Sequence, residues 1–415
     1  MCARVLAVDF GTSNSAAAVL DGGVPRRIRI EGDEDILPTA VFFPADRGTM
    51  RIGAAAGKAL IAGEEGRYMR ALKSILGTSL LHEERQIEGR RRTLSEIVTA
   101  FLIRIRERAE AETGETLTRV LSGRPVHFHS SDPGRDARAE ADLRACYHAA
   151  GFDEVRFLAE PEAAARTGHG IGGSGETGLI VDIGGGTSDF SVFRMTDGRV
   201  EILASHGIRL GGTDFDHAVS MTHVMPLLGQ GGQLRRTFGT GLLPVPNAIY
   251  RELATWAKIP FLYSRDTERS IEDLRRHTLE PDKIARLDAV IRNRLGHELA
   301  FAVERGKIAA NASVPQSRID MAFVEAGLSA PITPGTLNAA LVEFGDRLNG
   351  ALYETLLKAG TAPQQIGTVI LVGGSSLMSM ITRHVQDVCP GAKLQRSDAF
   401  TAVIDGLALA TGEAA

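Results

Sequence analysis

Two segments in opposite halves of the chain share one pattern, and this repetition constrains the fold more than any other feature of the sequence. Residues 6–15 are LAVDFGTSNS and residues 180–189 are IVDIGGGTSD, so each has Val-Asp, a hydrophobic residue, glycine and a hydroxyl cluster. Apolar residues resume after each polar turn, which predicts a hairpin of two buried strands at residues 4–20 and again at 178–193. Such a recurrence is typical of a duplicated domain.

The length of the chain also favours two lobes, because 415 residues exceed what one hydrophobic core usually organises. A glycine-rich stretch at residues 167–178 precedes the second hairpin and is predicted to connect the lobes. We therefore expect one lobe over residues 1–168 and another over residues 169–415, with no further core after them. Helical periodicity with little strand character predicts an insertion at about residues 222–315. The elements expected after it are a strand at 319–324, a helix at about 334–359, a strand at 368–372 and a helix at 401–411.

Composition excludes several classes of protein. With 43% hydrophobic and 24% charged residues, the chain has the profile of a soluble α/β protein and not of a disordered or fibrous one. A formal net charge of -4 at pH 7 gives no general attraction to nucleic acid or to an anionic membrane. No basic leader with a long apolar stretch opens the chain, and no segment has about 18 uninterrupted apolar residues, so neither secretion nor membrane insertion is expected. The cysteines Cys2, Cys146 and Cys389 form no disulfide, zinc or redox pattern, which favours the cytoplasm.

The two turns predict phosphate and magnesium chemistry. Asp9 and Asp182 lie near the ends of the first strands, and glycines follow at Gly11 and at residues 184–186. Glycine lets the backbone approach phosphate oxygens closely, and one or two carboxylates suffice for Mg²⁺ when water and phosphate supply its other ligands. Either turn alone would be an ordinary hairpin turn, but the pair predicts a phosphate clamp on each side of a cleft. The pattern fits neither GxxxxGK[ST] nor GxGxxG, because a strand and not a helix follows the glycines.

Further motifs extend the pattern along nearly all of the chain. In order, the seven motifs are Val8–Ser15, Ala71–Gly77, Ala159–Ala165, Val181–Asp189, Gly211–Asp216, Glu304–Lys307 and Val372–Ser376. Together they resemble the ATPase domain of the 70-kilodalton heat-shock chaperone family, within the actin and sugar-kinase superfamily, and in particular its short bacterial members without a substrate-binding domain. The resemblance implies an α/β fold of two ribonuclease-H-like, actin-like ATPase lobes around a central nucleotide cleft, with helical insertions.

By this resemblance, the activity is binding and slow hydrolysis of Mg-ATP. Lys73 places positive charge at the γ-phosphate and the attacking water. Glu160 contacts that water or the water shell of the metal, and Thr187 lies near the γ-phosphate. Asp9, Asp182 and Asp189 position Mg²⁺. The residues expected to bind ATP or ADP are Gly11, Thr12, Ser13, Asn14, Gly184, Gly185, Gly186, Thr187, Gly211, Gly212, Glu304, Lys307, Asn311, Gly373, Gly374, Ser375 and Asp398.

Without the resemblance, some of these residues have ordinary structural interpretations. Lys73 would be a solvated lysine in a helix or turn. The Glu-Pro pair at Glu160 and Pro161, where the resemblance places an interlobe switch proline, would start a helix. Glu304 and Lys307, at i and i+3 of a helix, would form a surface ion pair instead of contacting ribose or adenine.

The chain departs from the family pattern in two places. Leu377 occupies the position of an arginine that stacks on adenine, which removes a cation–π contact of about 0.5 to 2 kcal/mol. Residues 127–136 replace the aromatic-Asn-Asp pattern of the family. The family's relay arginine, which takes part in allosteric signalling through the switch proline, is therefore left open among Arg135, Arg138 and Arg144.

Two groups of side chains have more than one interpretation. His127 and His129 would share a strand face, as a metal pair could, but no clustered His or Cys pattern accompanies them, so strand histidines beside a turn are favoured. In the insertion, Trp256, Phe261 and Tyr263 form either a docking face for a protein partner or, as we favour, the core of the insertion.

Rival functions use the same fold, because fold does not determine function. A small-molecule phosphotransferase would need an acceptor pocket. A non-catalytic, nucleotide-gated interaction module would use ATP only to select one conformation and would recruit a partner through the insertion. Filament formation ranks below both.

Overall fold

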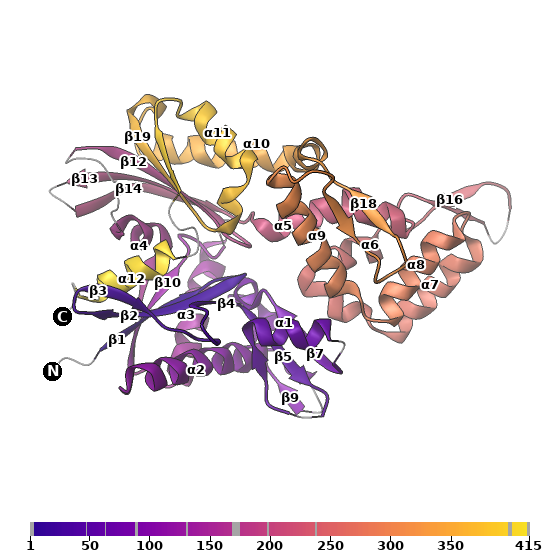
Figure 1. The fold of residues 1–415 in the computed structure, drawn as a ribbon, viewed down its shortest axis with the longest axis horizontal. Helices are drawn as coiled ribbons and strands as arrows, with labels where there is room; N and C mark the ends of the chain where they lie inside the picture. The colour runs from indigo at the N-terminus through magenta and orange to yellow at the C-terminus, as the bar shows by residue number, and fades with distance from the viewer. Residues whose placement is uncertain are drawn as a thin grey trace. The chain divides into compact units, whose positions relative to one another are not determined.

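The structure is a computed structural model that describes residues 4–46, 48–62, 64–87, 90–129, 132–167, 175–196, 199–236, 239–396 and 401–412 (Figure 1). The chain divides into two compact units. One comprises Met1–Gly212 and Asp346–Ala415, and the other Thr213–Gly345.

Two mixed sheets with the same strand order organise the first unit. The first sheet has the order β11-β10-β1-β2-β3 and the second has the order β14-β13-β12-β19-β20. In each, the first hairpin is antiparallel and its leading strand, β1 or β12, has a parallel partner on the other side. The duplication predicted from the two hairpins is therefore present in the topology. The bounds are β1 Val5–Phe10, β2 Asn14–Asp21, β3 Val24–Arg27, β10 Arg119–Arg124, β11 Glu154–Ala159, β12 Thr177–Ile183, β13 Ser188–Thr196, β14 Arg199–Ile208, β19 Ile366–Val372 and β20 Lys393–Arg396.

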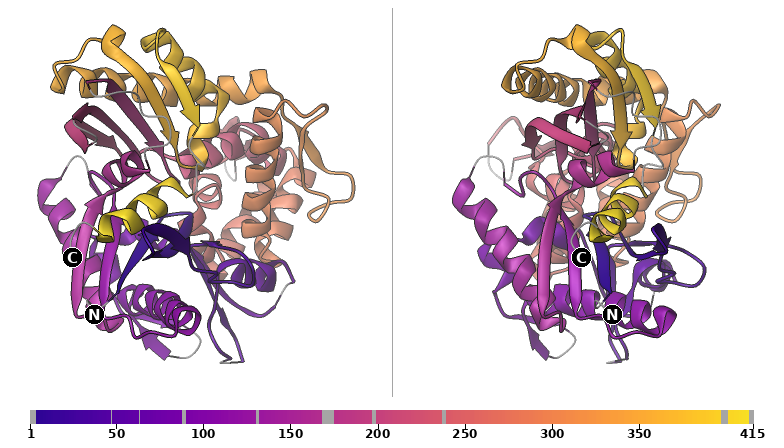
Figure 2. Two further views of the ribbon diagram at one scale, coloured as in Figure 1. Left: turned by 60° about the vertical axis from the view of Figure 1, so that its left-hand side comes forward. Right: turned by 90° about the vertical axis from the view of Figure 1, so that its left-hand side faces the viewer.

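Helices cover both faces of the first sheet, because its strands alternate between two apolar cores. Leu6, Val8 and Phe10 join the core that includes residues of α2 (Leu94–Thr113) and α3 (Pro133–Ala149). On the other face, small side chains such as Ala7 and Ala16 pack with α4 (Glu160–Arg166) and α12 (Ala402–Gly412). Figures 1 and 2 show α12 lying against the strands from the start of the chain.

Local signals explain where several of these helices begin and end. Thr93 and Glu96 form a capping box at the start of α2, and Gly114 ends that helix with a φ of 71°. Asp132 caps α3 by accepting a hydrogen bond from the backbone nitrogen of Arg135. The remaining regular elements of this part of the chain are β4 Ile36–Pro38, β5 Ala40–Pro44, β6 Arg51–Ile52, α1 Gly53–Ile61, β7 Gly66–Arg70, β8 Arg85–Ile87, β9 Arg90–Arg92 and α11 Ser379–Val388.

The second unit is mainly helical. Its helices α7 and α8 pack together, and buried residues include Ile271 and Leu274 of α7 and Leu287 of α8. The bounds are β15 Gln233–Arg235, β16 Leu242–Pro244, α6 Ala248–Leu253, α7 Arg265–His277, α8 Pro281–Arg292, α9 Gly296–Asn311, β17 Arg318–Asp320 and β18 Ser329–Pro331. Helices α5 (Gly212–Val219) and α10 (Pro334–Lys358) run across the boundaries between the units.

Most elements predicted from periodicity are confirmed, with two differences. The strand expected at residues 319–324 is confined to Arg318–Asp320. The chain turns after Met321, whose backbone oxygen accepts a hydrogen bond from the backbone nitrogen of Val324 and whose nitrogen donates to the oxygen of Leu328. The segment at 222–315 also contains the short β15–β16 hairpin, whose strands have mostly exposed side chains and therefore lack an apolar pattern. The lobe boundary at residue 168 stays a prediction, since residues 168–174 lie outside the described part of the chain.

Candidate functional site

The two repeated turns meet inside the first unit. The β1–β2 turn supplies Thr12 and Ser13, and the β12–β13 turn supplies Gly185 and Gly186. A Cβ atom on Gly185 would lie 2.1 Å from Oγ of Ser13, and one on Gly186 would lie 3.5 Å from Oγ1 of Thr12. The absence of side chains on the second turn therefore lets the hydroxyls of the first turn approach its backbone. This is the arrangement expected of two phosphate-binding turns.

Two further predicted loops pack beside the second turn. The backbone nitrogen of Gly212 donates to the oxygen of Gly184 at 3.0 Å, and a Cβ atom on Gly212 would lie 2.4 Å from Oγ of Ser375. A Cβ atom on Gly373 would lie 2.8 Å from Oδ1 of Asp182. The turn at Gly373 leads into a short 3₁₀ helix, Gly374–Leu377, and α11 begins only afterwards, at Ser379. The structure thus brings together the predicted segments 11–14, 184–187, 211–212 and 373–375.

Buried and partly buried carboxylates surround these turns. Burial, and next the charge of Glu160, raise the pKa of Asp9 to about 7. The same two causes raise the pKa of Asp189 to about 7 and that of Asp182 well above its usual range. Each of these shifts means that the ionised carboxylate lacks compensating positive charge. We call these four residues and Lys73 the acidic cluster.

Lys73 is the cation of the acidic cluster. It lies in a short 3₁₀ helix, Leu72–Ile75, which follows Ala71 with a φ of 60°. Its side chain is only 8% exposed, and its Nζ lies 2.6 Å from Oε1 of Glu160. Burial lowers the pKa of Lys73, but the charges of Glu160 and Asp9 outweigh this, so the pKa rises overall. The interpretation of Lys73 as a solvated lysine is therefore wrong.

Glu160 is the first residue of α4, directly after β11 ends at Ala159. Pro161 follows in the first turn of the helix, where a missing backbone N–H costs nothing. The predicted helix start is confirmed, and it aims the carboxylate of Glu160 at Lys73.

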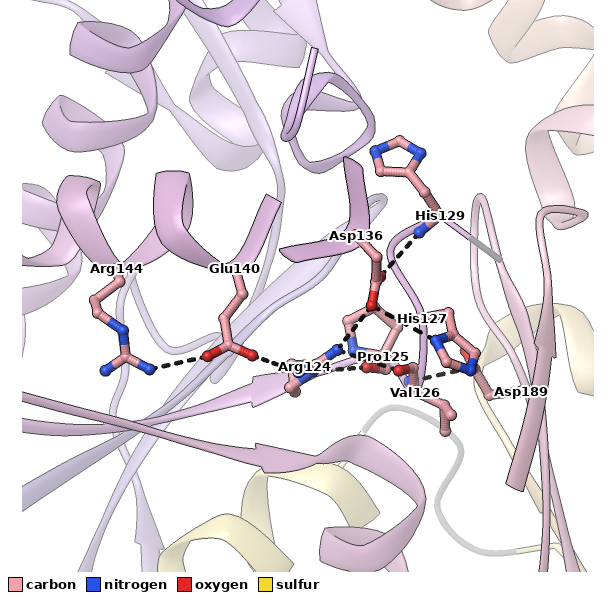
Figure 3. Close-up of polar contacts among 9 residues, drawn as sticks. All are labelled: Arg124, Pro125, Val126, His127, His129, Asp136, Glu140, Arg144 and Asp189. Atoms are coloured by element: carbon pink, nitrogen blue, oxygen red, sulfur yellow. Dashed lines mark hydrogen bonds and ion pairs between the residues drawn. The ribbon is translucent and has the colours of Figure 1, made fainter. Parts of the chain in front are cut away.

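A network of hydrogen bonds and ion pairs joins the segment that follows β10 to the acidic cluster (Figure 3). The backbone nitrogen of Val126 donates to Oδ1 of Asp189 at 3.2 Å. Arg124, the last residue of β10, donates through Nε and Nη2 to the backbone oxygens of Pro125 and Val126. Asp136 accepts a hydrogen bond from the backbone nitrogen of His129 and lies 3.6 Å from Nη2 of Arg124.

The network continues along α3. Glu140 accepts hydrogen bonds from both Arg124 and Arg144 (Figure 3). Of the three arginines left open by the sequence, Arg144 is joined to the segment through Glu140. Arg124, which was not predicted, contacts the segment directly. The sequence offered one indication of this role, because Arg124 stands at the end of a strand, immediately before Pro125.

His127 and His129 do not lie on a strand, because β10 ends at Arg124 and the segment bends around the arginine. His129 is buried, with Nε2 2.8 Å from the backbone oxygen of Leu76. His127 lies 3.5 Å from Asp136 and is 44% exposed. The prediction of strand histidines is thus wrong. Among the described residues, no group of three or more acidic, histidine or cysteine side chains is placed to hold a metal ion.

A cavity of about 30 Å³ opens beside Lys73. Its volume is enough for little more than ordered water. The residues that line it are Thr12, Lys73, Ser74, Pro125, Phe128, His129, Gly186, Thr187 and Arg209.

The predicted base and ribose contacts lie in the second unit, on α9. Lys307 is 9% exposed and pairs with Asp216, whose Oδ1 lies 2.6 Å from its Nζ. Glu304 and Asn311 are half-buried. The surface ion pair considered for Lys307 is therefore replaced by a buried one. Asp398 lies outside the described residues.

The aromatic residues of the insertion differ from one another. Trp256 is 5% exposed and packs on Phe301, with ring centroids 5.0 Å apart. The hydroxyl of Tyr263 donates to the backbone oxygen of Arg294. Phe261 is 54% exposed. Burial in the insertion is confirmed for Trp256 but does not extend to Phe261.

Comparison with protein families agrees with this geometry. A family model described as Hsp70 protein matches residues 5–228, which is more than half of the 415 residues of the chain. The chain belongs to the Hsp70 family. The match covers both repeated turns, Lys73 and Glu160. As a member of the Hsp70 family the chain has the actin-like ATPase fold, which confirms the predicted fold class, and it carries an ATP-binding, chaperone-like ATPase domain. No helix in the described part of this Hsp70 chain is both long and apolar enough to cross a bilayer.

Proposed function

We propose that this Hsp70-family chain binds Mg-ATP and hydrolyses it slowly to ADP and phosphate. The observation that carries the proposal is the acidic cluster, in which two buried carboxylates, Asp182 and Asp189, and two partly buried ones, Asp9 and Glu160, share one lysine beside two glycine turns. Structural ion pairs in a core are normally balanced, and this excess of negative charge is not. An excess of this kind is a feature of functional sites.

A divalent cation would supply the missing positive charge. Asp9, Asp182 and Asp189 are the residues that would hold Mg²⁺. Burial and the charge of Glu160 raise the pKa of each carboxyl, and a nearby cation would offset both effects by favouring the ionised form. Since the side chains form no direct three-ligand group among the described residues, the fit is to an ion whose other ligands are water and phosphate oxygens. When bound, Mg²⁺ would neutralise negative charge on the phosphates.

Hydrolysis needs a water oxygen to attack the γ-phosphorus while its bond to the bridging oxygen breaks. ADP leaves with that electron pair, and the proton of the water passes to solvent. Glu160 would orient the water by accepting its hydrogen bond. Lys73 would remain protonated and stabilise the phosphoryl oxygens, and the hydroxyls of Thr12, Ser13 and Thr187 would donate to phosphate.

The nucleoside end of the site is proposed from the resemblance of these motifs to the Hsp70 family. Gly373, Gly374 and Ser375 are proposed to lie under the adenosine, with Glu304, Lys307 and Asn311 contacting ribose or adenine. Leu377 supplies no cation for the adenine ring, so we expect a lower affinity than a stacked arginine would give.

The direct test is single-turnover hydrolysis of ATP with Mg²⁺ by the wild type and Lys73→Ala. Loss of one transition-state charge is expected to slow hydrolysis on the order of 10²- to 10³-fold. Lys258→Ala is the matched control, since Lys258 is 57% exposed in the second unit. Nucleotide binding and thermal unfolding must first show that each variant is folded.

The outcomes separate the rival functions. Phosphate release that depends on Lys73 supports the proposal. A phosphorylated small molecule among the products would instead indicate a phosphotransferase. Binding without turnover in the wild type would contradict hydrolysis and favour a nucleotide-gated interaction module, with a partner recruited through the insertion.

A further inference from the structure

Arg209 lies on a loop that is fastened to the second phosphate turn. It follows the end of β14 at Ile208 and precedes Gly211 and Gly212. The backbone oxygen of its neighbour Leu210 accepts a hydrogen bond from Oγ of Ser188 at 2.7 Å.

The backbone that follows Arg209 also packs closely against the second turn. A Cβ atom on Gly211 would lie 2.5 Å from the backbone nitrogen of Gly186 and 2.8 Å from the oxygen of Gly184. Any side chain at position 211 would therefore push the loop off the turn. The backbone at Arg209 is held in place on both sides, so the guanidinium extends from a fixed point.

The side chain of Arg209 reaches the phosphate side of the site. It lines the same small cavity as Lys73, Thr12 and Thr187. Its charge also acts on the imidazole of His129, another residue of that cavity. Arg209 is the second strong cation among the residues that line this cavity.

Two other nearby cations, Lys73 and Arg124, already have ion-pair partners. Lys73 contacts Glu160, and Arg124 contacts Asp136 and Glu140. The Arg209 guanidinium has no ion-pair partner within the part of the chain that the structure describes, and the residue is exposed. An unpaired arginine beside hydroxyls and backbone N–H groups fits an anionic ligand with several oxygens.

We propose that Arg209 is a further catalytic residue, whose guanidinium binds the terminal phosphate oxygens of a nucleoside triphosphate. This inference rests on the proposed ATP hydrolysis. As water adds to the γ-phosphorus and ADP leaves with the electrons of the broken P–O bond, Arg209 donates hydrogen bonds to the phosphoryl oxygens. It remains protonated throughout, and the proton of the water passes to solvent.

The test compares binding of two nucleotides with hydrolysis. Dissociation constants for ADP and for the non-hydrolysable analogue β,γ-imido-ATP are measured by calorimetry with Mg²⁺, followed by single-turnover hydrolysis of ATP. The variants are Arg209→Ala, Arg209→Lys and the control Arg91→Ala, whose side chain is 79% exposed on β9.

Arg209→Ala is expected to weaken analogue binding by about 10- to 100-fold, the loss for a hydrogen bond to a charged group, and to leave ADP binding within about twofold of the wild type. Hydrolysis should slow at least as much, and Arg209→Lys should recover part of both effects. Equal changes for ADP and the analogue, or no difference from Arg91→Ala, would overturn the role of Arg209 while leaving ATP hydrolysis intact. A wild type that binds neither nucleotide would overturn the proposed function and this inference together.

Discussion

The contact between α4 and α12 leads to a stability prediction that can be worked out from one glycine. Gly406 of α12 faces the backbone of α4, where a Cβ atom would lie 1.7 Å from the oxygen of Ala163 and 2.4 Å from its carbonyl carbon. Both partners are main chain, so no side-chain rotation relieves the overlap. Gly406→Ala must therefore push the two helices apart.

Two opposing effects determine the magnitude. Alanine in a helix interior is favoured over glycine by about 1 kcal/mol. Overpacking of a close-packed core costs about 1 to 3 kcal/mol, occasionally more, and a backbone overlap lies at the upper end because the alanine-rich layer around α12 must separate. We expect Gly406→Ala to lower the free energy of unfolding by about 2 kcal/mol.

Gly350→Ala is the matched control. Gly350 also lies inside a helix, α10, and a Cβ atom there would meet no atom within 4 Å. This variant should gain about 0.5 to 1 kcal/mol from helix propensity alone. Urea unfolding followed by far-ultraviolet circular dichroism measures both variants under the same conditions.

Gly406→Ala should also disturb the site, because α4 begins at Glu160 and that residue pairs with Lys73. A shift of α4 is expected to weaken this pair and to slow ATP hydrolysis in Gly406→Ala but not in Gly350→Ala. If the two variants are equally stabilised, the close approach of α12 to α4 is refuted.

Further predictions concern buried charges. Asp189→Asn should raise the free energy of unfolding of the nucleotide-free protein in EDTA. The difference from the wild type should grow by about 1.4 kcal/mol per pH unit between pH 5 and pH 7, because burial and the charge of Glu160 raise the folded pKa of Asp189 from 3.8 to about 7. The folded wild type holds a proton there that the unfolded chain releases, so its stability falls as the pH rises, and a pH-independent advantage in urea unfolding would contradict this. Lys307→Met should cost about 3 to 5 kcal/mol of folding free energy, because it removes the cation that contacts Asp216 in a buried ion pair. Adding Asp216→Leu should recover much of the loss, and a double variant no more stable than Lys307→Met would rule out that explanation.

Local patterns predicted the hairpins and the duplication. A buried strand, a glycine turn and a second buried strand are encoded by neighbouring residues, so the apolar runs around Asp9 and Asp182 were sufficient to identify β1–β2 and β12–β13. The repetition of the strand order in both sheets follows from that duplication.

These local patterns could not predict contacts between residues that are far apart in the sequence. Lys73 and Glu160 are 87 positions apart in the sequence, and no periodicity indicates that they form a buried pair. His127 and His129 alternate like strand residues, yet the hydrogen bonds from Arg124 to the backbone bend the segment. In this segment, hydrogen bonds from a side chain to the backbone replace the hydrogen bonds between strands that would extend β10, as is common beside functional sites.

The arrangement of charges explains why the site combines so many acids with a rigid frame. Repulsion among the buried carboxylates would spread them if the backbone allowed it, and the close contact of Gly185 with Ser13 and the hydrogen bond from Val126 to Asp189 oppose that movement. The frame thus holds negative charge where a cation is needed, and ligand binding would relieve the repulsion. Relief of repulsion stabilises only the ligand-bound protein. With Mg²⁺ and ADP we therefore expect the wild type to have a higher free energy of unfolding than Asp189→Asn, although without ligand the variant is the more stable of the two.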